Sequence, residues 1–148
     1  MRISVKGRYA LASVIVIAQR AQSRENVTVS SISEELGISK IYLEQVFSQL
    51  KKDGLLLSVK GPRGGYQLSR PPGKITVWDT LTTLEAGLTE QTENTVVDSA
   101  PEIEMSLQSL IFEPLNGMLE EWLSKITIQD LLDFTEKQKT QQSYMLNL

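Results

Sequence analysis

The 148-residue chain contains neither cysteine nor histidine, carries a formal net charge of −3 and is 41% hydrophobic. A chain of this length can form one domain with a full hydrophobic core plus an additional segment. The missing cysteine and histidine exclude disulfide bonds, zinc fingers, thiolate-held iron–sulfur clusters and histidine-based catalytic triads. We therefore expect no metal site and no cofactor.

The charges are unevenly distributed along the chain. Residues 1–74 carry 12 lysines and arginines against 5 aspartates and glutamates, a balance of +7, whereas residues 75–148 carry 3 against 13, a balance of −10. Phosphate contacts supply most of the affinity of non-specific DNA binding, so a basic half is the expected footprint of a DNA-binding region. The alternative is a chance distribution over solvated faces. The sequence predicts a DNA-binding region at 1–74 and an acidic region at 75–148 that points away from the duplex.

The first predicted element is a buried helix from about Lys6 to Gln19. The basic start and the apolar run Ala10–Ala18 superficially resemble a signal peptide, but no small-residue cleavage site follows. The run is also shorter than the roughly 20 residues that span a bilayer. A strand is the alternative, because Val14–Ile17 is rich in residues that favour strands. We expect a cytoplasmic protein without membrane contact.

Residues 30–54 predict two short helices joined by a tight turn. Ser31 and Glu34 have the spacing of a capping box, Ile32 faces inward, and Gly37 ends the first helix because glycine tolerates a positive φ. Ser39 is expected to cap the second helix. Its apolar face recurs at helical spacing and comprises Leu43, Val46, Phe47 and Leu50, and Gly54 ends it.

The outer face of this second helix carries the candidate base contacts Ile41, Glu44 and Gln45, followed by Ser48. Glutamine is suited to adenine N6 and N7, glutamate to the N4 amine of cytosine, and an aliphatic side chain to the methyl group of thymine. Lys40 and Tyr42 flank its N-terminal end, where they are expected to contact phosphates, which position a protein without reading sequence. The alternative for Glu44 and Gln45 is ordinary helix surface.

A β-hairpin is predicted next, with strands Leu55–Val59 and Tyr66–Leu68 and a glycine-rich loop that carries Lys60 and Arg63. A narrow minor groove attracts such cations. The loop lacks the Gly-Lys-Ser/Thr sequence of a nucleotide-binding loop and opens no helix. Helix, turn, helix and basic hairpin form the winged helix-turn-helix pattern, which places the second helix in a major groove.

The acidic half predicts three further helices. Thr76 and Asp79 resemble the cap of a helix whose inner face is Val77, Leu81, Leu84 and Leu88, and Thr89–Pro101 predicts a mobile loop. A long helix then starts near Glu102, and Pro114 either kinks it or restarts it. Thr127 and Asp130 cap a last helix, Ile128–Lys139, before a tail, Gln141–Leu148.

The long helix carries an apolar stripe that is longer than a small core can cover from one side. We therefore predict that it packs against a second copy of itself. The stripe recurs at three- and four-residue spacing and consists of Ile103, Leu107, Leu110, Ile111, Leu115, Met118, Leu119, Trp122 and Leu123, with Ile126 at its end.

Three ordered motifs, MRISVKGRYAL at 1–11, GISKIYLEQ at 37–45 and VKGPRGGY at 59–66, resemble the Rrf-two family of bacterial repressors across nearly the whole chain. The resemblance implies a mainly α (α+β) fold, a winged helix-turn-helix domain with a long C-terminal dimerisation helix at about 102–125. It also implies a homodimeric repressor that binds double-stranded DNA at a palindromic promoter site. The candidate DNA contacts are Arg2, Ser4, Lys6, Tyr9, Ser39, Lys40, Ile41, Tyr42, Glu44, Gln45, Lys60 and Arg63.

Two features separate the chain from other members. Cluster-binding members carry three cysteines between the fourth helix and the dimer helix, whereas Leu88–Leu107 has none, and relatives more often have a small polar residue where Ile41 stands. The segment Ser143–Met145 resembles the family's cluster-free cysteine-metabolism repressor. We therefore hypothesise that cysteine synthase captures the C-terminal carboxylate of Leu148; the alternative is a tail that packs on its own dimer.

Two other function classes compete with a DNA-binding regulator. A protein-interaction module that kept the winged fold and lost DNA binding would turn its basic face to acidic partners. An enzyme is not expected, because the acidic residues have no matching base with which to form a general acid–base pair.

Overall fold

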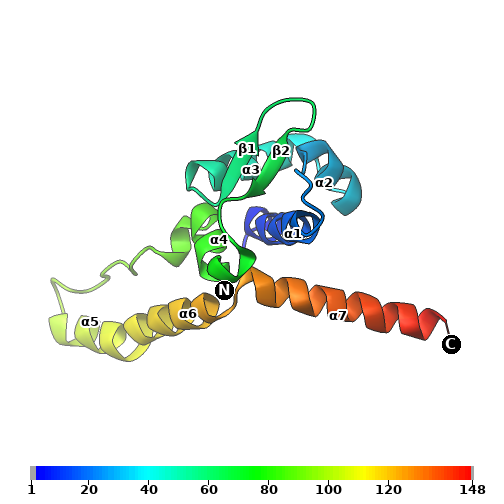
Figure 1. Cartoon of the computed structure of the whole chain (residues 1–148). Helices are drawn as coiled ribbons and strands as arrows, with labels where there is room; N and C mark the ends of the chain where they lie inside the picture. The colour runs from blue at the N-terminus through cyan, green and yellow to red at the C-terminus, as the bar shows by residue number, and fades with distance from the viewer. Residues whose placement is uncertain (1–2, 148) are drawn as a thin grey trace.

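The computed structural model describes residues 3–147, and it is mainly helical with one small sheet. Figure 1 shows the two-stranded sheet above a group of helices, with α5–α6 and α7 extending from this body in opposite directions. The α-helices and strands are α1 (Val5–Ala21), α2 (Val29–Leu36), α3 (Lys40–Lys52), β1 (Leu56–Val59), β2 (Gly65–Leu68), α4 (Val77–Leu84), α5 (Pro101–Leu107), α6 (Glu113–Lys125) and α7 (Ile128–Leu146). The predicted mainly α winged fold with a long C-terminal helical part is confirmed.

The first helix, α1, lies at the centre of the core. Its side chains Val14, Val16 and Ile17 are all buried, so burial on several sides outweighs the strand preference of these β-branched residues. Ser4 is the N-cap, and its hydroxyl accepts a hydrogen bond from Gly7 N at 3.1 Å. The predicted helix is confirmed, and the strand alternative is wrong.

The cap of α2 differs from the predicted one. The helix begins at Val29, and Thr28 is the N-cap, whose Oγ1 accepts a hydrogen bond from Ser31 N at 3.1 Å. Ser31 therefore stands inside the first turn, and its hydroxyl donates back to Thr28 O. The capping box predicted for Ser31 and Glu34 is wrong, because a suitable hydroxyl three residues earlier starts the helix. Gly37 ends α2 in the left-handed conformation with φ of +67°, as predicted.

The apolar face of α3 packs inward as predicted, since Leu43, Val46, Phe47 and Leu50 are buried. Ser39 is the N-cap, but its side chain makes no capping hydrogen bond. The Phe47 ring meets Tyr66 of β2 edge to face, with ring centroids 5.0 Å apart. This contact attaches the hairpin to α3.

The hairpin pairs Leu56 with Leu68 and Val59 with Gly65 in antiparallel register, close to the predicted strands. Val27, which lies outside the two strands, forms an isolated antiparallel bridge to Tyr66 of β2 through backbone hydrogen bonds of 3.0 and 2.7 Å. Gly65 has a φ of +145°, and a Cβ there would lie 2.8 Å from Val27 O, so only glycine fits this close approach.

Two capping boxes start α4 and α7, and both were predicted. In each box, the hydroxyl of the N-cap threonine accepts a hydrogen bond from the backbone N–H of the aspartate three residues later. The carboxylate of that aspartate accepts one from the backbone N–H of the threonine. The pairs are Thr76 with Asp79, and Thr127 with Asp130. Backbone bonds of 2.8 Å join the two helix starts, Val77 N to Ile126 O and Ile128 N to Ile75 O.

The core is continuous between the two halves of the chain. Ile128 and Leu132 of α7 are buried in the same cluster as α1 and α3. Beyond this start α7 is largely exposed, yet it remains helical to Leu146, so the tail predicted for Gln141–Leu148 is wrong over Gln141–Leu146. Leu148 lies outside the described residues. No helix within residues 3–147 is long and apolar enough to cross a membrane.

The long helix changes its hydrogen-bonding pattern just before Pro114. A π-helical turn, Gln108–Phe112, joins α5 to α6, and Glu113 N donates to Gln108 O five residues earlier. Pro114 has no N–H to donate, and in a regular α-helix its ring would clash with the carbonyl four residues earlier. The wider π-helical turn avoids this clash. Of the two predicted outcomes, a restart after an adjusted turn is the one observed. The segment before it, residues 89–100, has no helix or strand.

Candidate nucleic-acid interface

The outer face of α3 is open to solvent. Ile41 is 71% exposed, and Glu44 and Gln45 one turn further on are also exposed. These side chains face solvent because the apolar residues on the opposite face of α3 are buried in the core. An exposed isoleucine gains nothing from the fold, whereas it can contact a thymine methyl group. The predicted base contacts therefore share one accessible face, and their contact with DNA stays a prediction.

A cluster of three side chains connects α1 to the start of α3. Tyr9 and Tyr42 meet edge to face with ring centroids 5.4 Å apart, and Lys6 Nζ lies 5.6 Å from the centroid of the Tyr42 ring. Both tyrosines are half-buried. The sequence predicts Tyr9 and Tyr42 as DNA contacts, and the structure adds that they pack the two helices together.

The wing loop presents Lys60 and Arg63 at the surface. Asn26, before α2, donates a side-chain hydrogen bond to Arg63 O at 3.0 Å and so holds the loop from below. Sequence reasoning missed Asn26, because nothing local indicates that it reaches a residue 37 positions away.

Four of the predicted DNA contacts lie exposed at the starts of α1 and α3. Ser39 and Lys40 are exposed at the start of α3, and Ser4 and Lys6 are exposed at the start of α1. Within residues 3–147, the cations that form salt bridges are Arg20, Arg70, Lys125 and Lys139. None of them belongs to the predicted DNA contacts. Arg2 lies outside the described residues.

The apolar stripe of α5–α6 is largely uncovered in the single chain. Leu110 is 79% exposed and Trp122 is 66% exposed, and Ile103, Ile111, Leu115 and Met118 are exposed as well. Leu107, Leu119 and Leu123 are half-buried. Exposed apolar surface of this extent marks an interaction site. This exposure agrees with the predicted packing of the stripe against a second copy of the chain, and that packing stays a prediction.

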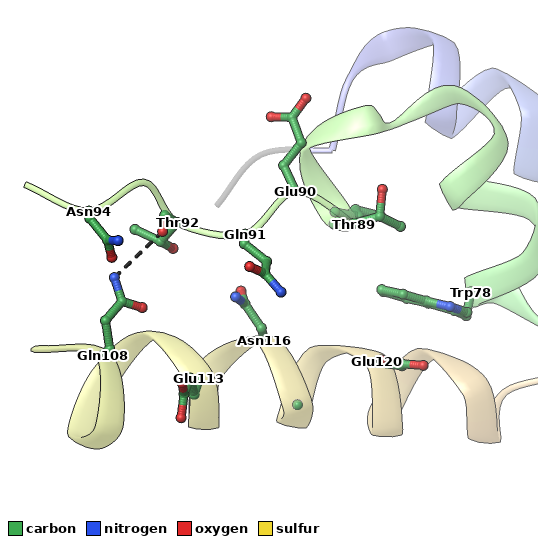
Figure 2. A pocket seen from close by; sticks show the side chains of 12 residues that line it. Trp78, Thr89, Glu90, Gln91, Thr92, Asn94, Gln108, Glu113, Asn116 and Glu120 are labelled. Carbon is green, nitrogen blue, oxygen red and sulfur yellow. Dashed lines mark hydrogen bonds between the residues drawn. The ribbon is translucent and has the colours of Figure 1, made fainter. Parts of the chain in front are cut away.

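A polar groove of about 600 Å³ lies on another side of α6, against residues 88–94. In Figure 2, Gln91 and Asn116 point toward one another across it, and the Trp78 ring closes one end. Gln108 donates to Thr92 O at 3.5 Å and to Glu104 Oε1 at 2.9 Å.

Glu104 fastens the loop to α5. The residue is only 4% exposed, and Oε2 accepts hydrogen bonds from Thr95 N at 2.9 Å and Val96 N at 2.8 Å. The Val96 N–H, the Gln108 amide and the Thr95 N–H lower the pKa of Glu104, because they stabilise the carboxylate. An ionised glutamate thus holds the loop in place.

Comparison with known proteins identifies the family. The profile described as Rrf2, iron-dependent transcriptional regulator, matches residues 3–133. The HTH-type transcriptional regulator IscR of Cronobacter sakazakii is 33% identical over 144 residues, which cover 93% of this chain and 88% of that protein. The chain belongs to the Rrf2 family.

Solved structures agree with this assignment. CymR, the global cysteine regulator of B. subtilis, superposes with a TM-score of 0.74 at 30% identity, covering 90% of this chain and 98% of that one. T. potens IscR gives a TM-score of 0.72 at 32% identity, covering 93% and 90%. This Rrf2 protein is therefore a winged-helix, DNA-binding transcriptional regulator and not an enzyme.

The iron in the family description does not fit the residues of this Rrf2 protein. The chain has no cysteine or histidine, so no thiolate or imidazole is present to bind an iron–sulfur cluster. Within residues 3–147 no group of three or more acidic side chains is placed to hold a metal ion. Glu104, the buried carboxylate beside the groove, is already bonded to two backbone N–H groups and an amide.

Proposed function

We propose that this Rrf2 regulator is a cytoplasmic, sequence-specific repressor that binds a palindromic promoter site as a homodimer without an iron–sulfur cluster. The observation that carries the proposal is the presence, in one chain, of an open basic winged-helix face and an uncovered apolar stripe on α5–α6. Two-fold pairing through the stripe gives two recognition helices related by symmetry, and such a pair reads a palindrome.

The roles within this interface follow from the chemistry of each side chain. Ile41, Glu44 and Gln45 read base edges, since they stand on the exposed face of α3. Arg2, Ser4, Lys6, Tyr9, Ser39, Lys40 and Tyr42 contact the DNA backbone beside them. Lys60 and Arg63 place positive charge in the adjacent minor groove.

The salt dependence of DNA binding tests the electrostatic part of this proposal. Lys60→Ala should weaken binding to cognate and random duplexes alike, and it should lower the slope of log K against log salt by about one, because one cation that displaces counterions from the DNA is lost. Fluorescence anisotropy over a salt series measures both. Lys137→Ala, an exposed lysine on α7, serves as the matched control and should leave the slope unchanged.

The intact protein gives the broader test. Genome-wide footprinting should return palindromic promoter sites, and a duplex with such a site should show steep salt dependence. A flat salt dependence, with tight binding to a protein partner and no shift of any promoter fragment, would instead identify a protein-interaction module.

A second part of the proposal concerns a role in sulfur metabolism. The similar B. subtilis protein is named as a global cysteine regulator, and the last helical turn presents Tyr144, Met145 and Leu146, the last of these 81% exposed. We propose that this end binds cysteine synthase. Because α7 is helical to Leu146, insertion of an extended C-terminus would require the last turn to unwind.

Deletion of Tyr144–Leu148 should abolish binding to cysteine synthase and leave DNA affinity unchanged, since Tyr144–Leu146 form the last turn of α7, far from the winged region (Figure 1). Isothermal titration calorimetry with purified cysteine synthase measures the first, and anisotropy measures the second. Gln141→Ala, an exposed change one turn earlier, should retain binding. Unchanged calorimetric affinity after the deletion would refute the tail hypothesis.

A further inference from the structure

The N-cap residue of α1, Ser4, is itself hydrogen-bonded to a carboxylate from a distant part of the chain. In the capping boxes of α4 and α7, an aspartate three residues after the N-cap accepts the N-cap's own N–H. The corresponding position of α1 is Gly7, which has no side chain. The Glu85 carboxylate, at the end of α4, takes this place: Oε1 accepts a hydrogen bond from Ser4 N at 2.6 Å.

The packing around this bond leaves little room for change. Gly7 is buried, and a Cβ on it would lie 2.5 Å from Glu85 Oε1 and 2.9 Å from Ile3 Cγ2. Glycine therefore allows the carboxylate to reach the backbone of Ser4. Ser4 in turn accepts from Gly7 N with its hydroxyl and from Arg8 N with its carbonyl oxygen.

The capped turn leads directly to the proposed DNA contacts. Lys6 stands within it, and Lys6 and Tyr9 contact Tyr42 at the start of the recognition helix. We propose that Glu85 is a positioning residue for DNA binding: it completes the capping box of α1 from α4 and so fixes Lys6 at the phosphate backbone. The inference rests on the proposed function, because it assumes that Lys6 contacts DNA.

The direction in which DNA affinity changes when Glu85 is replaced distinguishes a positioning role from a purely electrostatic one. A carboxylate on the basic half repels phosphates, so if charge alone mattered its removal would tighten DNA binding. If Glu85 positions Lys6, its removal weakens binding. Glu85→Gln keeps an oxygen that accepts the Ser4 N–H and removes the charge, and it should therefore retain or slightly improve affinity.

The test compares Glu85→Ala, Glu85→Gln and Lys6→Ala in the full chain, on a palindromic duplex identified by footprinting. Glu85→Ala should weaken binding about tenfold and lower the salt slope by about one, because an ordered cationic contact is lost. Adding Glu85→Ala to Lys6→Ala should cause no further loss. Glu93→Ala, an exposed glutamate of the 89–100 loop, is the matched control and should bind at least as tightly as the wild type.

A measurement without DNA completes the experiment. Hydrogen exchange over residues 3–12 of the free protein should be faster in Glu85→Ala than in Glu85→Gln or Glu93→Ala. Tighter DNA binding by Glu85→Ala, unchanged exchange, or losses that multiply with Lys6→Ala would each overturn the inference while wild-type binding upholds the proposed function. A wild-type protein that binds no duplex would overturn the proposed function itself.

Discussion

Leu115→Glu is expected to convert the regulator to a monomer and to weaken operator binding on the order of 10²-fold or more. Leu115 is exposed in the single chain, within the apolar stripe of α5–α6. A carboxylate there would face the apolar surface of a second copy, where an unpaired charge is strongly unfavourable. Loss of the dimer removes the gain from binding two half-sites at once, which is commonly 10²–10⁴-fold.

Sedimentation velocity measures the first effect and fluorescence anisotropy the second. Asn116→Glu is the matched control, because it adds the same charge at the next residue of α6, on the groove side that Figure 2 shows. This variant should remain dimeric and bind DNA. Because Leu115 is exposed, the substitution should leave the fold of each chain intact, which circular dichroism checks. A dimeric Leu115→Glu protein, or a monomeric wild type, would refute pairing through this stripe.

Much of the fold could be predicted because its signals are local. The caps at Thr76 and Thr127 need only residues three positions away. Gly37 ends α2 because glycine tolerates the left-handed backbone conformation found there. The outer face of α3 followed from the four apolar residues on its inner face. The cap of α2 was misplaced because Thr28 and Ser31 are both suitable hydroxyl residues, and their spacing alone does not choose between them.

The remaining features depend on contacts between distant residues or on weak patterns. The bond from Ser4 to Glu85 spans 81 positions, and Asn26 reaches the wing over 37. The end of α7 was predicted as a tail because it lacks a periodic apolar face, although Gln141, Gln142, Met145 and Leu146 are residues that favour helix. The π-helical turn before Pro114 relieves a backbone clash. The sequence indicates that this clash must be avoided, but it does not indicate which backbone geometry avoids it.

Gln45→Ala is expected to weaken binding to the cognate site by about 1–3 kcal/mol, or roughly 5- to 150-fold, with little change on random duplexes. The reason is that an exposed glutamine on α3 can make paired hydrogen bonds to adenine, which alanine cannot replace. The amide carries no charge, so no counterion is displaced when it binds, and the salt slope should stay that of the wild type. This combination distinguishes a base contact from the purely electrostatic contact expected of Lys60.

Anisotropy titrations on cognate, base-substituted and random duplexes measure the effect. Replacing the base pair that Gln45 reads should weaken the wild type and leave Gln45→Ala nearly unaffected, since the contact is already absent. Gln138→Ala, an exposed glutamine on α7, is the control and should match the wild type on every duplex. Equal losses on cognate and random DNA would place Gln45 at the phosphate backbone, and no loss on either would make it ordinary helix surface. The recognition helix would then have to read its site through Glu44 and Ile41, the other exposed side chains at the start of the same face.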